Sequence, residues 1–114
     1  MEGIVDRKIK EEILRFRDER NWSQYHNPKD LAISLSLESA ELLEAFQWKT
    51  SEEAVKEKSP EIADELADVF IYGVLLAEAM DLDIPAIISD KLTKNKAKYP
   101  VDKAFGKRNK YTEL

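Results

Sequence analysis

The chain contains no cysteine among its 114 residues, which excludes a disulfide framework and a thiolate metal site. It has only three glycines and four prolines, too few for a β fold with many turns. No apolar run approaches the roughly 20 residues that span a bilayer. The charged N-terminal segment also lacks a secretory apolar stretch. We therefore expect a cytoplasmic protein with no membrane partner.

Basic charge is also scarce, because 18 Lys and Arg residues face 23 Asp and Glu residues and the net charge is −5. Proteins that bind nucleic acid polymers usually present a basic surface, so we expect no such partner. Hydrophobic residues make up 43% of the chain, which is enough for a folded core. A chain of this length suits one domain, which we expect over residues 1–114.

Cap and proline signals divide the chain into helices. Asn27-Pro28 and Ser59-Pro60 each place a side-chain cap before a proline at the start of a helix, and Asp83 precedes Pro85 in a similar way. The predicted helices cover residues 5–20, 28–48, 59–80 and 84–99. Residues 49–58 read as a solvated connector with a short helical turn at most. Residues 101–114 read as a loosely ordered basic tail.

The two central predicted helices are apolar on two sides when their residues are placed at about 100° intervals. In the first helix, one apolar stripe contains Leu31, Leu35, Leu42 and Phe46. The opposite side of that helix contains Ile33, Ala40 and Leu43. In the second helix, one apolar stripe contains Ile62, Leu66, Val69, Leu76 and Met80. The opposite side contains Ala67, Ile71 and Val74. A helix that is apolar on two sides is buried on two sides, and so short a chain has few helices to cover both. We therefore expect a homo-oligomer.

Carboxylates lie in or beside these apolar stripes. The first helix carries Glu38 inside its stripe, followed along one flank by Glu41 and Glu44. The second carries, along one edge of its stripe, Glu61, Glu65 and Asp68, with Tyr72 one turn beyond. A single pair of acidic residues three positions apart usually lies on an ordinary solvent-exposed face of a helix. Two sets on neighbouring helices, one interrupting a packing face, instead favour a bound cation, because unpaired carboxylates are costly there.

The ligand types indicate which metal such a site would hold. A di-iron site would need Glu-x-x-His motifs, whereas the single histidine of this chain lies in a predicted loop. Magnesium is favoured because it binds through a few carboxylates and completes its coordination with water and phosphate oxygens. Manganese is the alternative.

Three segments carry a resemblance to a known family. They are LSLESAELLEAFQWK from Leu35, EIADELADVFIY from Glu61 and DKLTKNKAKYP from Asp90. This order of motifs resembles the MazG-like all-α nucleoside triphosphate pyrophosphohydrolases, and within them the dCTP pyrophosphatase branch. The segments NWSQYHNPKDL and KYTEL are similar to that branch as well. The resemblance covers nearly the whole chain from about Glu12.

The resemblance implies a four-to-five-helix bundle completed by a second subunit, as a dimer or a dimer-of-dimers tetramer. It implies an enzyme that hydrolyses a nucleoside triphosphate, here dCTP or a modified dCTP, between the α- and β-phosphates to give a monophosphate and pyrophosphate. The family's ExxE and ExxD motifs, which chelate magnesium and carry catalysis, correspond to Glu38, Glu41, Glu65 and Asp68. For activation of the attacking water, Glu41 is the first candidate and Glu38 the second.

The same resemblance suggests which residues bind the nucleotide. Candidate phosphate or sugar contacts are Lys91, Asn95, Lys98 and Tyr99, which lie on or beside one face of the last predicted helix. Relatives often have arginine near residues 96–98, where this chain has lysine, so a bidentate contact between a guanidinium and a phosphate is less expected here. Candidate base and sugar contacts are Trp22, His26, Trp48 and Tyr72. Without the resemblance, these lysines would read as side chains reaching to solvent and these aromatics as core or loop packing.

Two alternatives stay open at this point. The same chemistry could act on dUTP or on a broad range of triphosphates, because base choice depends on a few hydrogen bonds that a sequence does not reveal. A helical assembly module that is not an enzyme, with carboxylates holding a structural cation, is the alternative from another functional class.

Overall fold

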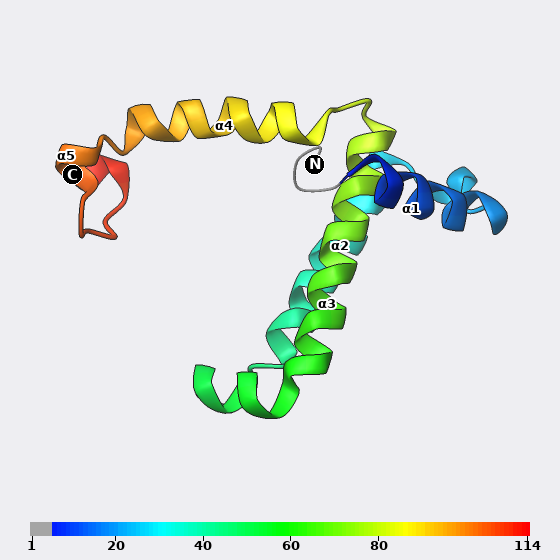
Figure 1. Cartoon of the computed structure of the whole chain (residues 1–114), viewed down its shortest axis with the longest axis horizontal. Helices are drawn as coiled ribbons and strands as arrows, with labels where there is room; N and C mark the ends of the chain where they lie inside the picture. The colour runs from blue at the N-terminus through cyan, green and yellow to red at the C-terminus, as the bar shows by residue number, and fades with distance from the viewer. Residues whose placement is uncertain (1–5) are drawn as a thin grey trace. The chain divides into compact units, whose positions relative to one another are not determined.

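The structure, a computed structural model, describes residues 6–114 and confirms the all-α prediction, because that part of the chain contains helices and no strand (Figure 1). The elements are α1 (Arg7–Glu19), η1 (Ser23–Tyr25), α2 (Pro28–Glu44), α3 (Ser51–Ala79), α4 (Ile84–Lys98), α5 (Val101–Ala104) and η2 (Tyr111–Glu113). Between residues 6 and 114, no helix combines the length and apolar character that crossing a bilayer requires.

Side-chain caps explain where the helices begin. The side chain of Asn27 accepts a hydrogen bond from the Asp30 amide at 2.9 Å, with Pro28 in the first turn of α2. Asp83 caps α4 in the same way at 3.0 Å, so both predicted starts are confirmed. α1 begins at Arg7 behind a cap at Asp6, and residue 5, the predicted start, lies outside the described residues.

The connection between α2 and α3 differs from the prediction. α2 ends at Glu44, and the chain continues to Trp48 through tighter turns with i→i+3 hydrogen bonds. Trp48 then adopts a left-handed backbone conformation with φ of 64°, and the predicted end near residue 48 therefore lies beyond the end of α2.

The prediction that residues 49–58 form a connector was wrong. α3 already begins at Ser51, where Thr50 and Glu53 form a reciprocal capping box with two hydrogen bonds of 3.1 Å. The backbone of Lys58 is non-helical, so α3 consists of two helical parts that meet at a kink there. Ser59-Pro60 begins the second part, as predicted, and this part runs on to Ala79.

The chain forms two compact units, the first ending at Leu82 and the second covering Asp83–Leu114. In the first unit α2 and α3 pack side by side as a hairpin, and α1 contacts α3 (Figure 1). Among residues 6–114, the buried apolar side chains all lie in this hairpin: Leu31, Ala54, Val74, Leu75 and Ala77.

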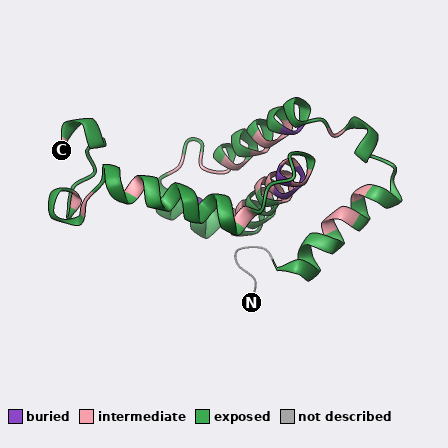
Figure 2. Cartoon of the chain, turned by 90° about the horizontal axis from the view of Figure 1, so that it is seen from above, coloured by how far each residue is buried: buried purple, intermediate pink, exposed green. Residues whose placement is uncertain are grey.

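Much of the apolar surface of the hairpin stays exposed in the single chain (Figure 2). Ile33 and Leu43, on the predicted second side of α2, are 48% and 63% exposed. On α3 the pattern is reversed, because Val74 is buried whereas Leu66, on the predicted main stripe, is 43% exposed. The two apolar sides are thus present on both helices, and one chain covers only part of them.

In the second unit, α4 is followed by α5 and η2, so the predicted tail contains two short helical elements. The ring of Tyr111 packs edge-to-face against that of Tyr99, with centroids 6.0 Å apart. The Lys98 ammonium lies 4.9 Å from the centroid of the Tyr111 ring. These contacts connect η2 to the end of α4.

Candidate metal centre and adjoining pocket

Three carboxylates meet between α2 and α3. Glu38 projects from α2, and Glu65 and Asp68 project from neighbouring turns of α3, because residues three apart share one side of a helix. Each offers an oxygen atom, and the three oxygens lie within 4.8 Å of one another. We call Glu38, Glu65 and Asp68 the carboxylate cluster. All three side chains are half-buried.

The environment of the cluster opposes three negative charges at once. Glu38 Oε2 and Glu65 Oε2 are buried and accept no hydrogen bond, and in residues 6–114 no Lys or Arg forms a salt bridge with the cluster. Burial, together with the nearby carboxylates of Glu41, Asp68 and Glu65, raises the pKa of Glu38 to about 7. Burial, followed by the carboxylates of Glu41 and Asp68, also raises the pKa of Glu65. The cluster therefore has unused acceptors and too little positive charge.

Such a donor set fits a hard divalent cation. Its ligand atoms are all carboxylate oxygens, the type that magnesium and manganese bind, and no thiolate or imidazole belongs to the group. A cation would also satisfy the two buried oxygens of Glu38 and Glu65 that have no partner. The residues present are thus suited to a metal ion.

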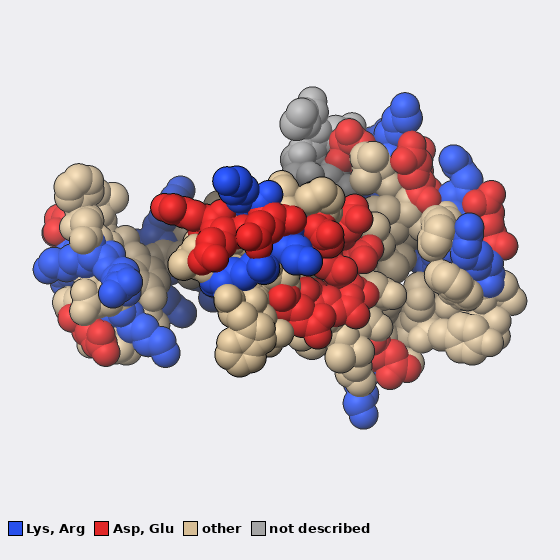
Figure 3. All heavy atoms as spheres, turned by 90° about the horizontal axis from the view of Figure 1, so that it is seen from below, with Lys and Arg blue, Asp and Glu red and all other residues tan. Residues whose placement is uncertain are grey.

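Glu41 occupies a different position from the other predicted ligands. It is exposed and lies outside the group of oxygens within 4.8 Å, but its carboxylate helps to raise the pKa of both Glu38 and Glu65. Glu41 therefore adjoins the carboxylate cluster on its solvent side. Acidic side chains also cover much of the hairpin surface in Figure 3, whereas Lys and Arg predominate on the second unit.

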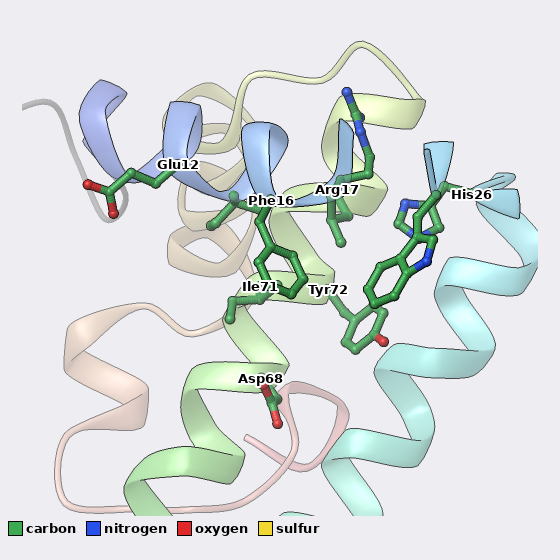
Figure 4. A pocket seen from close by; sticks show the side chains of 10 residues that line it. Glu12, Phe16, Arg17, His26, Asp68, Ile71 and Tyr72 are labelled. Atoms are coloured by element: carbon green, nitrogen blue, oxygen red, sulfur yellow. The ribbon is translucent and has the colours of Figure 1, made fainter. Parts of the chain in front are cut away.

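A pocket of about 320 Å³ begins beside the cluster, within the first unit. Its walls come from α1, the loop around η1 and α3, and its lining residues are Glu12, Ile13, Phe16, Arg17, Trp22, His26, Asp68, Ile71, Tyr72 and Leu75. Figure 4 shows Phe16 projecting from α1 toward Ile71, with Asp68 at the lower edge. Asp68 thus belongs to both the carboxylate cluster and the pocket, so the two features are continuous.

Aromatic rings make this pocket suitable for a flat ligand. Trp22 and Tyr72, predicted as base and sugar contacts, both line it. Phe16 packs edge-on against Trp22, with ring centroids 5.7 Å apart, which fixes the orientation of the indole. An apolar pocket of this size with a few polar groups is typical of a small-molecule site.

His26 supplies one of those polar groups. Its Nδ1 atom is buried and has no hydrogen-bond partner. Burial lowers the pKa of the imidazole, and the nearby Arg17 guanidinium lowers it further, so the ring is neutral near pH 7. A neutral imidazole has one donor and one acceptor nitrogen available to a ligand in the pocket.

Trp48, the third aromatic residue predicted to contact the base, is not among the residues that line this pocket. It lies in the connection between α2 and α3, and its side chain is 98% exposed. The Thr50–Glu53 capping box and an ion pair between Lys49 and Glu57 follow directly after it. The indole therefore faces solvent in the single chain.

The predicted phosphate contacts all belong to the second unit. Lys91 and Lys98 are exposed on α4, Asn95 between them is half-buried, and Tyr99 directly follows the last residue of α4. Lys91, Asn95 and Lys98 follow at intervals of four and three residues, which places them along one face of α4.

Sequence reasoning missed several pocket residues. Ile13 and Phe16 were recognisable as the apolar face of the first helix, but nothing in the sequence showed that this face lines a pocket with Ile71 and Leu75. Arg17 carries a clearer signal in retrospect, because a cation beside an apolar stripe and close to a histidine loop is a candidate pocket residue.

Comparison with known proteins gives consistent matches. The model of the MazG-like family matches residues 33–114. dCTP pyrophosphatase 1 of Mus musculus is 38% identical over 104 residues, and that of Homo sapiens 39% over 105; each match covers 87% of this chain and 61% of the relative. The chain thus spans about three fifths of the length of these relatives. The crystal structure of a pyrophosphatase from Archaeoglobus fulgidus superposes with a TM-score of 0.77 at 39% identity, covering 82% of this chain and 90% of that one. The chain belongs to the MazG-like family.

Proposed function

We propose that this protein is a magnesium-dependent nucleoside triphosphate pyrophosphohydrolase that acts on dCTP or a modified dCTP. The observation that carries the proposal is the continuity of the carboxylate cluster with the aromatic pocket through Asp68. A nucleotide with its base in the pocket would direct its phosphates towards the cluster. The names of the similar proteins, dCTP pyrophosphatase 1 and a pyrophosphatase, agree with this assignment.

The chemistry follows from the groups present. A divalent cation at the cluster would neutralise charge on the triphosphate and polarise the scissile phosphoryl group. Glu38, Glu65 and Asp68 would hold that cation. Glu41, which adjoins the cluster on its solvent side, would orient the water that attacks the α-phosphorus, with Glu38 as the second candidate. Hydrolysis there gives a nucleoside monophosphate and pyrophosphate.

The nucleoside would bind in the pocket. Trp22 and Tyr72 would contact the base and sugar faces, and His26 would hydrogen-bond the base through its unpartnered Nδ1. The family resemblance further suggests that Lys91, Asn95 and Lys98 of α4, with Tyr99 directly after it, would contact the phosphates or the sugar.

We further propose that the working enzyme is a homo-oligomer, a dimer or a dimer of dimers. Leu37, Leu43 and Phe70 are 60%, 63% and 45% exposed, and a hairpin this apolar would be poorly stable in water without a partner surface. Trp48, which is 98% exposed, is an additional candidate for contact with a second copy or with a base bound there.

The deciding experiment is a panel of nucleoside triphosphates assayed for pyrophosphate release with magnesium, with manganese and with chelator. Preferred turnover of dCTP or its modified forms, dependent on the metal, is the expected result. Preference for dUTP, or equal rates on many triphosphates, would overturn the substrate assignment but keep the reaction. No pyrophosphate release from any triphosphate would leave a cation-binding assembly module and overturn the enzyme assignment.

A further inference from the structure

The C-terminal segment of the chain makes a contact whose function nothing above explains. Tyr111, in η2, lies with its ring 4.9 Å from the ammonium of Lys98 and edge-to-face against Tyr99 at 6.0 Å. One ring therefore contacts two consecutive residues at the end of α4. Both of those residues are proposed phosphate or sugar contacts, and the whole arrangement lies inside the second unit.

Packing alone does not account for the position of Tyr111. Its side chain is 45% exposed, and no residue of η2 is buried. The backbone hydrogen bonds that η2 makes are local: the Glu113 amide donates to the Lys110 carbonyl, and the Leu114 amide donates to the Tyr111 carbonyl. In the described chain, the ring contacts that join η2 to α4 are those made by Tyr111.

The contact matters because lysine is flexible. Its four-carbon side chain loses rotamer freedom when it is fixed on a phosphate, and that loss weakens binding. An aromatic face that attracts the ammonium restricts the side chain beforehand. At an exposed site, the strength of such a contact corresponds to about a two- to fivefold change in a binding constant.

We propose that Tyr111 is a positioning residue that orients the Lys98 ammonium for the triphosphate of the substrate. This inference rests on the proposed function. Tyr111 acts through Lys98 and does not itself contact the substrate. The C-terminal segment would thus support phosphate binding through Lys98.

Two substitutions at this position separate the ring from the hydroxyl. Tyr111→Phe keeps the aromatic face, whereas Tyr111→Leu removes it at similar bulk. We expect Y111L to raise KM for dCTP about two- to fivefold with kcat within about twofold of wild type, and Y111F to match wild type. Thr112→Ala, an exposed neighbour in η2, is the matched control and should change neither constant.

A double-mutant cycle identifies the route of the effect. If Tyr111 acts through Lys98, Y111L should raise KM in the wild-type background and should have no further effect in the Lys98→Met background. An undiminished effect of Y111L in that background would overturn the proposal and indicate a general role in folding of the tail. So would a Y111F variant that is as impaired as Y111L, or a Y111L variant with wild-type KM.

A binding measurement separates this inference from the proposed function. Inorganic tripolyphosphate with magnesium, titrated calorimetrically, has no base and needs no turnover. Weaker binding to Y111L and K98M, with no hydrolysis of any nucleotide by wild type, would retain the Tyr111 inference and reject the enzyme. If the wild type hydrolyses nucleotides but wild type, Y111L and K98M bind tripolyphosphate equally well, the enzyme assignment would be kept and the Tyr111 inference rejected. A wild-type protein that neither binds tripolyphosphate nor hydrolyses nucleotides would overturn both.

Discussion

The carboxylates of Glu38 on α2 and Asp68 on α3 offer oxygens within 4.8 Å of each other across the helical hairpin. Two like charges at this distance repel each other, and the half-buried setting strengthens the repulsion. The fold therefore supports an arrangement that is unfavourable for the protein alone and favourable with a cation. This relationship underlies the first two predictions.

Removing one charge from the cluster should abolish catalysis without unfolding the protein. Glu65→Gln keeps the size and shape of the side chain but removes a ligand charge, so we expect pyrophosphate release to fall at least about a hundredfold. Circular dichroism should show an unchanged helical content. Glu52→Gln, an exposed change in the first turn of α3, serves as the control. A rate for E65Q within tenfold of wild type would contradict the metal-ligand assignment.

The cluster could be predicted from the sequence because helical periodicity determines which residues share a face. Glu65 and Asp68 are one turn apart on α3, and Glu38 interrupts the apolar stripe of α2, so two neighbouring helices brought the three together. The exposure of Glu41 is less predictable. It depends on how far α2 is rotated against α3, which packing in three dimensions decides.

Sequence signals for helix starts were harder to interpret where a capping pattern lay within a highly charged segment. The highly charged segment 49–58 read as solvated loop, although Thr50 and Glu53 have the spacing of a capping box and Ala54 is fully buried. The start at Ser59-Pro60 was read correctly, because the non-helical backbone of Lys58 separates the two helical parts of α3 and Pro60 lies near the start of the second. The contact of Tyr111 with Lys98 depends on the path of the chain after α4, which no periodic pattern encodes.

The raised pKa of Glu38 predicts how the stability of the metal-free protein depends on pH. Burial, with the neighbouring carboxylates, raises its pKa to about 7 in the folded state, against 4.5 ordinarily. Between those values the folded state binds more protons than the unfolded state, so Glu38 makes the free energy of unfolding fall as pH rises from about 4.5 to about 7. Urea unfolding in chelator at pH 5 and pH 7 measures this loss.

Glu38→Gln isolates the contribution of this side chain, because it cannot titrate. We expect E38Q to lose less stability than wild type between pH 5 and pH 7, and magnesium to stabilise wild type at pH 7 more than it stabilises E38Q. Equal pH dependence in the two proteins would show that Glu38 is not the group responsible.

The aromatic pocket predicts a separate effect on substrate binding. Trp22→Ala should raise KM for dCTP by roughly 5- to 150-fold, because stacking on an aromatic side chain contributes about 1–3 kcal/mol per base. Tripolyphosphate, which has no base, should bind W22A as it binds wild type. Tyr25→Ala is the control, since Tyr25 lies in the same loop, is 65% exposed and does not line the pocket. A weaker tripolyphosphate complex with W22A would indicate general damage to the site instead.

The exposed apolar side of the hairpin predicts the behaviour of the chain in solution. Leu43 is 63% exposed on α2, and a charge there should prevent burial against a second copy. We expect wild type to elute as a dimer or tetramer in size exclusion with light scattering, and Leu43→Glu to dissociate at micromolar concentration. Lys29→Glu, which adds negative charge at the exposed start of α2, should leave the oligomer intact. A wild-type protein that is monomeric at micromolar concentration would remove the reason for expecting a second subunit. The exposure of Leu43 and Trp48 would then call for a different partner.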